Sequence, residues 1–348
     1  MTRVPALENP HTHWREGDVV GPLVELAIQG GAIGFGPMPN TKEGLMTAAQ
    51  VTAYVKNASS FVELGTGVHI IPIVQITEAT TEADIDACIE AGIVDAKIYP
   101  KGRTTASHNG VSYYSRILPI VQHAGKRGMR VHFHPEHPMK IDNKDAEFLF
   151  LPIVDMFLSE TDAIIVSEHG TDGRCIPLWE EWAKTGRFFV TITAHHLVEN
   201  ETGAYGDVDA VCKPSYKGEV DRRALNDLVR KDYPWVMAGG DDAPHDKKTK
   251  HRIGPCTCGA YTAPFLMQLY AHALDDLFTS PEGVKVFENF TSRNARKLYG
   301  FRTSSRYVDL IKRPFIIPES YKIGSWEVAP FWAGREISYS LYANSSVK

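Results

Sequence analysis

Residues 6–13, Ala-Leu-Glu-Asn-Pro-His-Thr-His, form a short strand-like segment that ends in two histidines one residue apart. In an extended strand alternate side chains point to the same face, so His11 and His13 direct two imidazoles at one place. Neutral imidazole is a common ligand of zinc-like metals. Alone, the pair also fits two partly exposed surface residues. The rest of the chain decides between these interpretations.

Similar short apolar or β-branched runs recur along the chain. We predict strands at Ala6–His13, Ala32–Phe35, Val68–Gln75, Ala96–Tyr99, Arg130–His134, Ala163–Glu168, Phe188–Thr193 and Trp235–Gly239. Helix-like segments lie between them at Thr41–Ser60, Thr81–Ala91, Tyr113–Arg127, Ile176–Thr185 and Asp221–Arg230. Eight strands that alternate with helices predict a parallel (β/α)8 TIM barrel rather than an open sheet.

The composition is ordinary for a globular chain, with 43% apolar and 23% charged residues in 348. No Pro/Gly/Ser linker, composition shift or repeat divides the sequence, so we predict one domain over residues 1–348. The net charge of −5 gives no reason to expect nucleic-acid binding. We interpret the one basic cluster, Lys247 to Arg252, as a solvated loop.

Other features of the sequence indicate a cytoplasmic protein without a membrane partner. Met1 to Pro10 lacks the pattern of a secretory signal, and no apolar run has the length of a membrane span. Five cysteines in so long a chain do not make a disulfide framework. Cys256-x-Cys258 lacks a second pair to close a tetrahedral metal site, so we expect reduced thiols.

Ionisable residues lie at or just after the predicted strand ends, except for Lys97, which lies inside the fourth strand. They are His11 and His13, Lys97, His134, His169 and Asp241. The C-terminal ends of barrel strands converge on one mouth, where active sites of this fold lie. Four imidazoles and a carboxylate suit two zinc-like ions.

Two points stay open on the residues alone. A buried Lys97 that reacted with carbon dioxide would become a carbamate able to bridge two metals, but a snorkelling or ion-paired lysine is the simpler interpretation. His132 and His134 share one strand face, so periodicity allows either to be the ligand.

The chain resembles the single-domain bacterial dihydroorotases of the amidohydrolase superfamily over almost its whole length. The resemblance is carried in order by His11-x-His13-x-Arg15, Met38-Pro39-Asn40, Lys97-Ile98-Tyr99-Pro100 with Thr104-Thr105, His134-Pro135-Glu136, Glu168-His169, His196-Leu197, Gly240-Asp241-x-Ala243-Pro244-His245 and Ala329-Pro330-Phe331-x-Ala333-Gly334. Each motif is a weak signal, but eight in register are a strong one.

The resemblance implies a role for each matching residue. His11, His13 and Asp241 would hold the more buried of two Zn²⁺ ions, and His134 and His169 the more exposed one. An N6-carboxylated Lys97 would bridge them. Asp241 would also be the catalytic base and then acid.

Substrate residues follow from the same resemblance. Arg15, Asn40 and His245 would bind the substrate carboxylate, and Thr104 and Thr105 would belong to a mobile loop over the site, unless they form only a solvated loop. Lys213 stands where the family commonly has an apolar residue that contacts the substrate ring through its backbone.

Further positions qualify the resemblance. Asp242 replaces a small residue, and we expect it to turn outward as a helix cap. The family's pattern selects His134, which leaves His132 as a hydrogen-bonded neighbour. His195 and His196 are expected to stay outside the metal centre, and Trp14 to lie in the core.

The implied activity is the interconversion of N-carbamoyl-L-aspartate and L-dihydroorotate in de novo pyrimidine biosynthesis, by a homodimer. One alternative is a hydantoinase- or dihydropyrimidinase-like enzyme with a different ring substrate. Another is a metal-free barrel that serves as a scaffold. The carboxylate-binding residues distinguish the first two, and metal content distinguishes the third.

Overall fold

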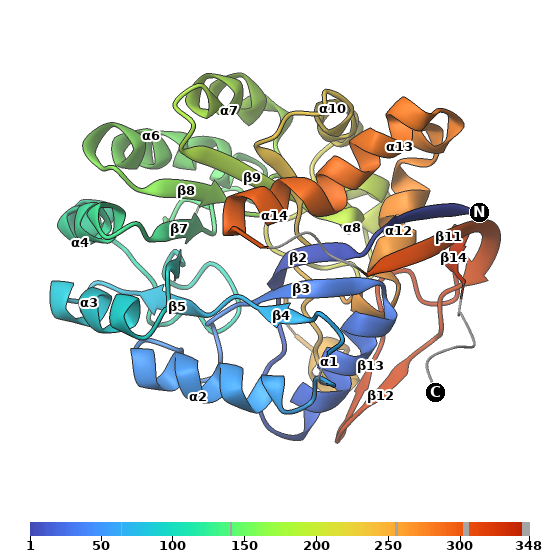
Figure 1. Ribbon diagram of the computed structural model, residues 1–348, viewed down its shortest axis with the longest axis horizontal. Coiled ribbons are helices and arrows are strands. Elements are labelled where there is room, and N and C mark those ends of the chain that lie inside the picture. The colour runs from blue at the N-terminus through green and yellow to red at the C-terminus, as the bar shows by residue number, and fades with distance from the viewer. Residues whose placement is uncertain (64, 140, 255–256, 302–305, 343–348) are drawn as a thin grey trace.

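The computed structural model describes residues 1–63, 65–139, 141–254, 257–301 and 306–342. Its centre is built of parallel strands surrounded by helices (Figure 1). The central strands are β2 (Leu7–Thr12), β3 (Ala32–Pro37), β4 (His69–Ile70), β5 (Ile73–Ile76), β6 (Asp95–Ile98), β7 (Arg130–Phe133), β8 (Ile164–Ser167), β9 (Phe188–Ile192) and β10 (Val236–Ala238). Each predicted strand is present, with β4 and β5 as two parts of one on either side of Ile71 and Pro72. The predicted (β/α)8 fold is confirmed.

The parallel strands form two hydrogen-bonded blocks, which meet between β10 and β2. In the first block, the strands from β5 to β10 each pair with the next strand in sequence. In the second block, β3 pairs with β2 on one side and with β4 on the other. The blocks meet where β10 ends beside β2: the Asp241 amide donates to the His11 carbonyl at 2.9 Å, and Thr12 forms a parallel bridge with Asp242. Residues from opposite ends of the barrel sequence therefore become neighbours.

Amphipathic helices cover the barrel. The longer ones are α1 (Val20–Gln29), α2 (Ala48–Ser59), α3 (Glu82–Glu90), α4 (Tyr114–Lys126), α6 (Leu151–Glu160), α7 (Ile176–Ala183), α10 (Glu219–Arg230), α12 (Leu266–Ala273) and α13 (Pro281–Glu288). In α4 the buried residues Tyr114, Ile117, Val121 and Ala124 recur every three or four positions, as one helix face requires. The α3 helix begins with a reciprocal cap between Thr81 and Asp84.

Two local predictions are wrong. The helix expected at Thr41–Ser60 begins only at Ala48, because Thr47 and Gln50 form a capping box that fixes its start. The basic cluster is not simply a solvated loop, since Lys247–Lys250 is the short helix α11 and Lys250 is buried. The Lys250 ammonium donates to the carbonyls of Val211 (2.8 Å) and Gly259 (2.7 Å), which offsets the cost of burying it.

Segments near the two ends of the chain add small antiparallel sheets. Strand β1 (Thr2–Pro5) pairs with β11 (Tyr307–Ile316), which pairs in turn with β14 (Glu336–Leu341). Strands β12 (Tyr321–Ile323) and β13 (Trp326–Val328) form a hairpin. Figure 1 shows β11 and β14 beside the N-terminus, next to α12. These sheets were not predicted.

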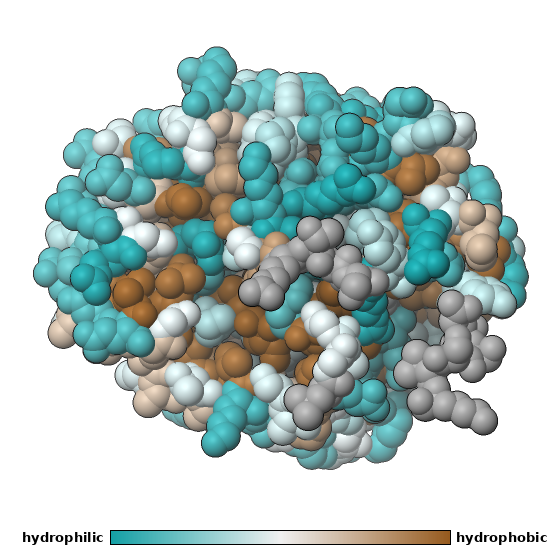
Figure 2. Space-filling view, in the orientation of Figure 1, coloured by the Kyte–Doolittle hydropathy of each residue, from teal (hydrophilic) through white to brown (hydrophobic). Residues whose placement is uncertain are grey.

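Hydrophilic side chains dominate the outer rim of the face in Figure 2, with hydrophobic ones showing nearer its middle. Among the helices in the described ranges, none combines the length and apolarity needed to cross a bilayer.

Candidate metal centre and substrate pocket

Two histidines at the end of β2 and an aspartate after β10 meet where the barrel closes. The Nε2 atoms of His11 and His13 lie 3.1 and 3.0 Å from the same oxygen, Oδ1 of Asp241. All three side chains are buried. Imidazole nitrogens and a carboxylate oxygen that converge in this way are the donor set of a zinc-like ion.

The charges at this meeting point are strongly coupled. Burial opposes the charged form of His11, yet the carboxylates of Glu168 and Asp241 outweigh it and raise the pKa of its imidazole. Burial also opposes ionisation of Asp241, but the neighbouring His11 and His13 hold its pKa well below the usual range. The pKa of His13 falls to about 4, chiefly because of burial. The carboxylate is thus ionised, and the His13 ring is neutral with a free lone pair.

His134 and His169 complete a ring of imidazoles. Their ring centroids are 4.6 Å apart, and those of His11 and His169 are 5.2 Å apart. His134 Nε2 is 2.7 Å from Glu136 Oε2, which leaves its Nδ1 available to a metal. His169 Nδ1 is buried without a hydrogen-bond partner among the described residues. Ligand atoms of His11, His169 and Asp241 all lie within 4.8 Å of one another.

Lys97, on β6, is completely buried, and its amine has no hydrogen-bond partner in the described part of the chain. Burial lowers the pKa of the amine to about 8, although Glu168 and Asp241 oppose this change. An orphaned and partly neutral amine at this depth is a nucleophile and carries an unmet polar demand. The residues present therefore fit a metal centre with a modified lysine better than they fit an ordinary lysine.

Three of the predicted site residues have left-handed backbone. The φ angle is 56° at Arg15, 41° at His169 and 43° at Asp241. Side-chain-bearing residues rarely adopt this conformation, and it persists where surrounding structure enforces it. Each residue lies two or three positions after the end of a central strand, where the chain turns at the mouth of the barrel.

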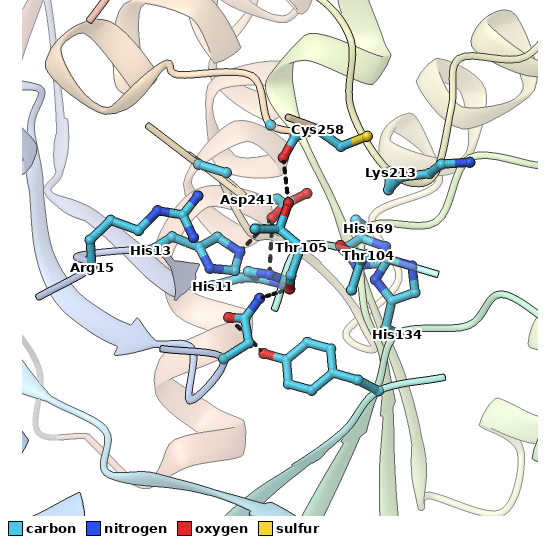
Figure 3. A pocket seen from close by; sticks show the side chains of 14 residues that line it. His11, His13, Arg15, Thr104, Thr105, His134, His169, Lys213, Asp241 and Cys258 are labelled. Carbon is cyan, nitrogen blue, oxygen red and sulfur yellow. Dashed lines mark hydrogen bonds and ion pairs between the residues drawn. The ribbon is translucent and has the colours of Figure 1, made fainter. Parts of the chain in front are cut away.

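One pocket unites most of the predicted residues (Figure 3). It is lined by His11, His13, Arg15, Asn40, Tyr99, Thr104, Thr105, His134, His169, Lys213, Asp241, Ala243, Cys258 and Gly259. Of the predicted residues, Lys97 and His245 are not in this lining. His245 nevertheless contacts it, because its Nε2 lies 3.2 Å from Arg15 Nη2 and 2.9 Å from the Cys258 carbonyl.

The carboxylate-binding candidates are held in place before any ligand arrives. Arg15 Nε donates to the Pro244 carbonyl at 3.0 Å. Asn40 accepts from the Tyr99 hydroxyl at 3.1 Å through its Oδ1. These hydrogen bonds hold the Arg15 guanidinium and the Asn40 amide in place. Both groups line the same pocket as the metal ligands, where they can bind an anion.

The loop that carries Thr104 and Thr105 lies over the pocket. The Thr105 carbonyl accepts from Asn40 Nδ2 at 3.0 Å, and its hydroxyl donates to the Cys258 carbonyl at 3.2 Å. Arg103 in the same loop pairs with buried Glu136 at 3.3 Å. These bonds connect the loop to both sides of the mouth, as dashed lines for Thr105 show in Figure 3.

Lys213 is among the residues that line the pocket. Its ammonium points away from the pocket in Figure 3 and donates to Asn143 Oδ1. It also lies 4.0 Å from Glu136 Oε1. The aliphatic part can therefore line the pocket while the charge stays outside it.

Asp242 corrects one prediction. It does not turn outward as a helix cap but is buried, and it accepts hydrogen bonds from Asn9 Nδ2 and Thr12 Oγ1, both at 2.7 Å. No helix begins here because Asp242 bridges to Thr12 on one side and to Ala260 on the other. Burial raises the pKa of its carboxyl to about 6.

Two further groups of histidines lie near the predicted ligands. His132 lies between the carboxylates of Glu168 and Asp95 and is not in the pocket lining. His195, His196 and Cys212 cluster closely enough to hold a metal. However, His196 Nδ1 meets the Thr193 hydroxyl at 2.7 Å, its Nε2 meets the Pro214 carbonyl at 3.1 Å, and Cys212 donates to that carbonyl. His196 and Cys212 thus have other partners, whereas neither ring nitrogen of His195 has a hydrogen-bond partner among the described residues. That His195 and His196 stay outside the metal centre remains a prediction.

Some lining residues were missed. Tyr99 and Ala243 stand inside quoted motifs, so their motif membership was an available signal. Cys258 and Gly259 gave none, because the Cys-x-Cys pattern was interpreted as free thiols; Cys256 lies outside the described residues. Trp14 is buried against Phe35, as predicted, with ring centroids 5.0 Å apart.

Sequence comparison finds relatives over nearly the whole chain, although no family model matches it. The dihydroorotase of Helicobacter pylori strain J99 is 28% identical over 342 residues, which cover 95% of this chain and 96% of the relative. The probable dihydroorotase of Schizosaccharomyces pombe is 29% identical over 325 residues, which cover 91% and 93%.

The chain is a relative of the dihydroorotases.

Solved structures agree on the fold. The dihydroorotase from Saccharomyces cerevisiae, in complex with 5-fluoroorotic acid, matches with a TM-score of 0.90 at 23% identity and covers 98% of this chain and 99% of that one. An L-hydantoinase (dihydropyrimidinase) from Arthrobacter aurescens matches with a TM-score of 0.80 at 13% identity, covering 97% and 82%. The chain thus has the fold that these dihydroorotase and hydantoinase structures share.

Proposed function

We propose that the chain is a dihydroorotase that interconverts N-carbamoyl-L-aspartate and L-dihydroorotate in pyrimidine biosynthesis. The observation that carries the proposal is that an arginine, Arg15, lines the same pocket as the imidazoles and the carboxylate of the metal centre. A cyclic amide with a carboxylate substituent needs both features within one site, and an uncharged ring does not need the arginine. The whole-length similarity to dihydroorotases supports the same substrate.

The proposed cofactors are two Zn²⁺ ions per chain, bridged by N6-carboxylated Lys97. His11, His13 and Asp241 would hold the more buried ion, and His134 and His169 the more exposed one. Bound in this way, the ions supply Lewis acidity to the scissile carbonyl and acidify the attacking water.

The chain's own residues carry the remaining steps of ring opening. Arg15, Asn40 and His245 bind and orient the ring carboxylate. Asp241 Oδ1, which is ionised and faces the centre, takes the proton of the attacking water and returns it to the departing ring nitrogen. The Thr104–Thr105 loop excludes bulk water while this happens. Ring closure follows the same path in reverse.

The proposal also covers the organisation of the protein. We propose one domain over residues 1–348, supported by the pairing of β1 with β11 across almost the whole chain length. A cytoplasmic homodimer follows from the family resemblance.

The decisive assay follows hydrolysis of dihydroorotate by ultraviolet absorbance, with hydantoin and dihydrouracil as controls. We expect turnover of dihydroorotate, weak or no turnover of the uncharged rings, and about two equivalents of metal per chain. Faster turnover of an uncharged ring would favour the hydantoinase-like alternative, and absence of metal would favour a scaffold.

The Arg15→Met variant tests the role of the arginine. In this variant the carboxylate of bound substrate would be buried without its cationic partner. We therefore expect kcat/KM for dihydroorotate to fall about 100-fold or more, while metal content stays unchanged. Arg116→Met is the matched control, because Arg116 is exposed, contacts Glu78 and Tyr113, and does not line the pocket. Equal kinetics of Arg15→Met and the control would refute carboxylate binding by Arg15.

A further inference from the structure

A continuous chain of buried polar groups extends from the metal centre into the barrel. His11 Nδ1 lies 2.9 Å from Glu168 Oε2, and the other oxygen of Glu168 lies 2.6 Å from His132 Nδ1. His132 Nε2 lies 3.1 Å from Asp95 Oδ1. Arg130 then binds Asp95 through two bonds, from Nε at 2.7 Å and from Nη2 at 2.6 Å.

This network of polar groups extends along the strands from one end of the barrel to the other. Glu168 follows the C-terminal end of β8, His132 lies within β7, and Asp95 and Arg130 are the first residues of β6 and β7. Glu168, His132 and Asp95 are at most 1% exposed. The Arg130 side chain is 14% exposed, so the network reaches the surface only at its far end.

Such a network is costly in a barrel interior, where branched apolar side chains normally pack. Its geometry is fully determined, because both ring nitrogens of His132 face carboxylate oxygens and must both donate. The His132 ring also stacks on Tyr299, with centroids 6.0 Å apart and an interplanar angle of 18°. The ring therefore has one orientation.

The consequence for the centre passes through Glu168. Its carboxylate receives His11 Nδ1, His132 Nδ1 and the Thr191 hydroxyl at 2.7 Å, so it cannot rotate. A fixed Glu168 keeps the Nδ1 proton on His11 and directs His11 Nε2 toward Asp241, as a metal-binding histidine requires.

We infer that His132, Asp95 and Arg130 are positioning residues that hold Glu168, and through it orient His11 for the buried metal. None of the three lines the pocket. Asp95 fixes the His132 ring from below, and Arg130 fixes Asp95. This inference rests on the proposed metal centre and extends it to the opposite end of the barrel.

The test measures zinc affinity directly, by competition with a chromogenic chelator, in the full-length protein. The quantity compared is the affinity for the zinc ion that the chelator removes first. His132→Leu is expected to weaken this affinity by about 10- to 100-fold. Asp95→Ala, three hydrogen bonds away from His11, is expected to weaken it by up to about tenfold, and Asp95→Asn, which keeps an acceptor for His132, is expected to restore most of the affinity. In the His132→Leu background Asp95→Ala should change nothing further, because the connection is already broken.

A matched control separates positioning from general destabilisation. Val131 precedes His132 on β7, points to the opposite face and is packed in the hydrophobic core. Val131→Ala is expected to lower thermal stability but to leave zinc affinity unchanged.

The outcomes are distinct. Wild-type protein that binds no zinc overturns the proposed function. Wild-type protein that binds zinc, with Asp95→Ala and His132→Leu equal to it or additive with each other, overturns the positioning role alone. If His132→Leu does not fold, the comparison of Asp95→Ala with Asp95→Asn decides, and equal affinities in that pair also overturn it.

Discussion

Glu147 gives a stability prediction whose size follows from its surroundings. It lies between α5 (Asn143–Ala146) and the 3-10 turn at Phe148–Phe150, and its carboxyl is buried. Both oxygens accept from the Thr171 amide, at 3.1 and 3.0 Å, and one also contacts the Thr171 hydroxyl. Burial raises the pKa of Glu147 to about 7, although the nearby Lys217 ammonium opposes the change. Glu147 thereby ties down the segment that follows His169.

The sign of the pH dependence follows from proton binding. Between the ordinary pKa of 4.5 and the raised pKa of about 7, the folded state keeps the Glu147 proton and the unfolded state has lost it. Stability therefore falls as pH rises through this window and levels off above it. The group is fully buried, so the difference of about 2.5 pKa units corresponds to about 3 kcal/mol in total, of which about 2 kcal/mol develops between pH 5.5 and 8.5.

Glu147→Gln removes this titration and keeps one acceptor oxygen for Thr171. With an unfolding entropy near 2.1 cal/mol/K per residue over 348 residues, about 2 kcal/mol corresponds to roughly 3 °C in Tm. The Tm of the variant relative to wild type should therefore rise by about 3 °C between pH 5.5 and 8.5.

The assay is differential scanning calorimetry of metal-free protein in chelator, which removes the pH dependence of metal binding. Glu90→Gln, at an exposed helix end, is the control and should keep a constant difference from wild type. A Glu147→Gln difference that is flat across this pH range, or that falls, would refute the argument from burial.

Two further predictions concern the mouth of the pocket. Arg103→Gln weakens the charged contact with Glu136 that holds the Thr104–Thr105 loop over the pocket. We expect kcat/KM for dihydroorotate to fall about tenfold at unchanged metal content. Kinetics equal to wild type would show that this contact does not contribute to loop closure. Lys213→Leu keeps an apolar stem in the lining and removes only an ammonium that faces away, so kcat/KM should stay within about fivefold of wild type; a larger loss would mean that the charge reaches the substrate.

The strand ends could be predicted because two periodicities agree there. Alternation within β2 directs His11 and His13 to one place, and the barrel brings Asp241 to the same place from more than two hundred residues away. The small sheet of β1, β11 and β14 could not be predicted in this way, because its partners are far apart in sequence and their pattern alone does not name the pairing.

Local backbone geometry decided the positions where sequence reasoning failed. Asp242 follows a left-handed residue, and its bridges to Thr12 and Ala260 keep it in the barrel wall instead of at a helix start. Lys213 departs from the apolar residue that the resemblance leads one to expect, and its long stem lets its ammonium leave the lining for Asn143. Neither the turn nor the direction of the stem is written in residue type alone.

His132 and His134 show how far alternation can determine function. Both point into the barrel, as the period of two requires, so the sequence alone leaves either as a ligand. The two histidines differ in how deep they lie in the barrel. The ring of His134 lies at the mouth, 4.6 Å from the ring of His169. His132 lies two residues earlier on the strand, deeper in the barrel, and has a carboxylate at each ring nitrogen. A nitrogen that already donates to a carboxylate has no lone pair for a metal, so the partners exclude His132 as a ligand. The side-chain period therefore identifies the face of a strand, and the layer within the barrel assigns the role.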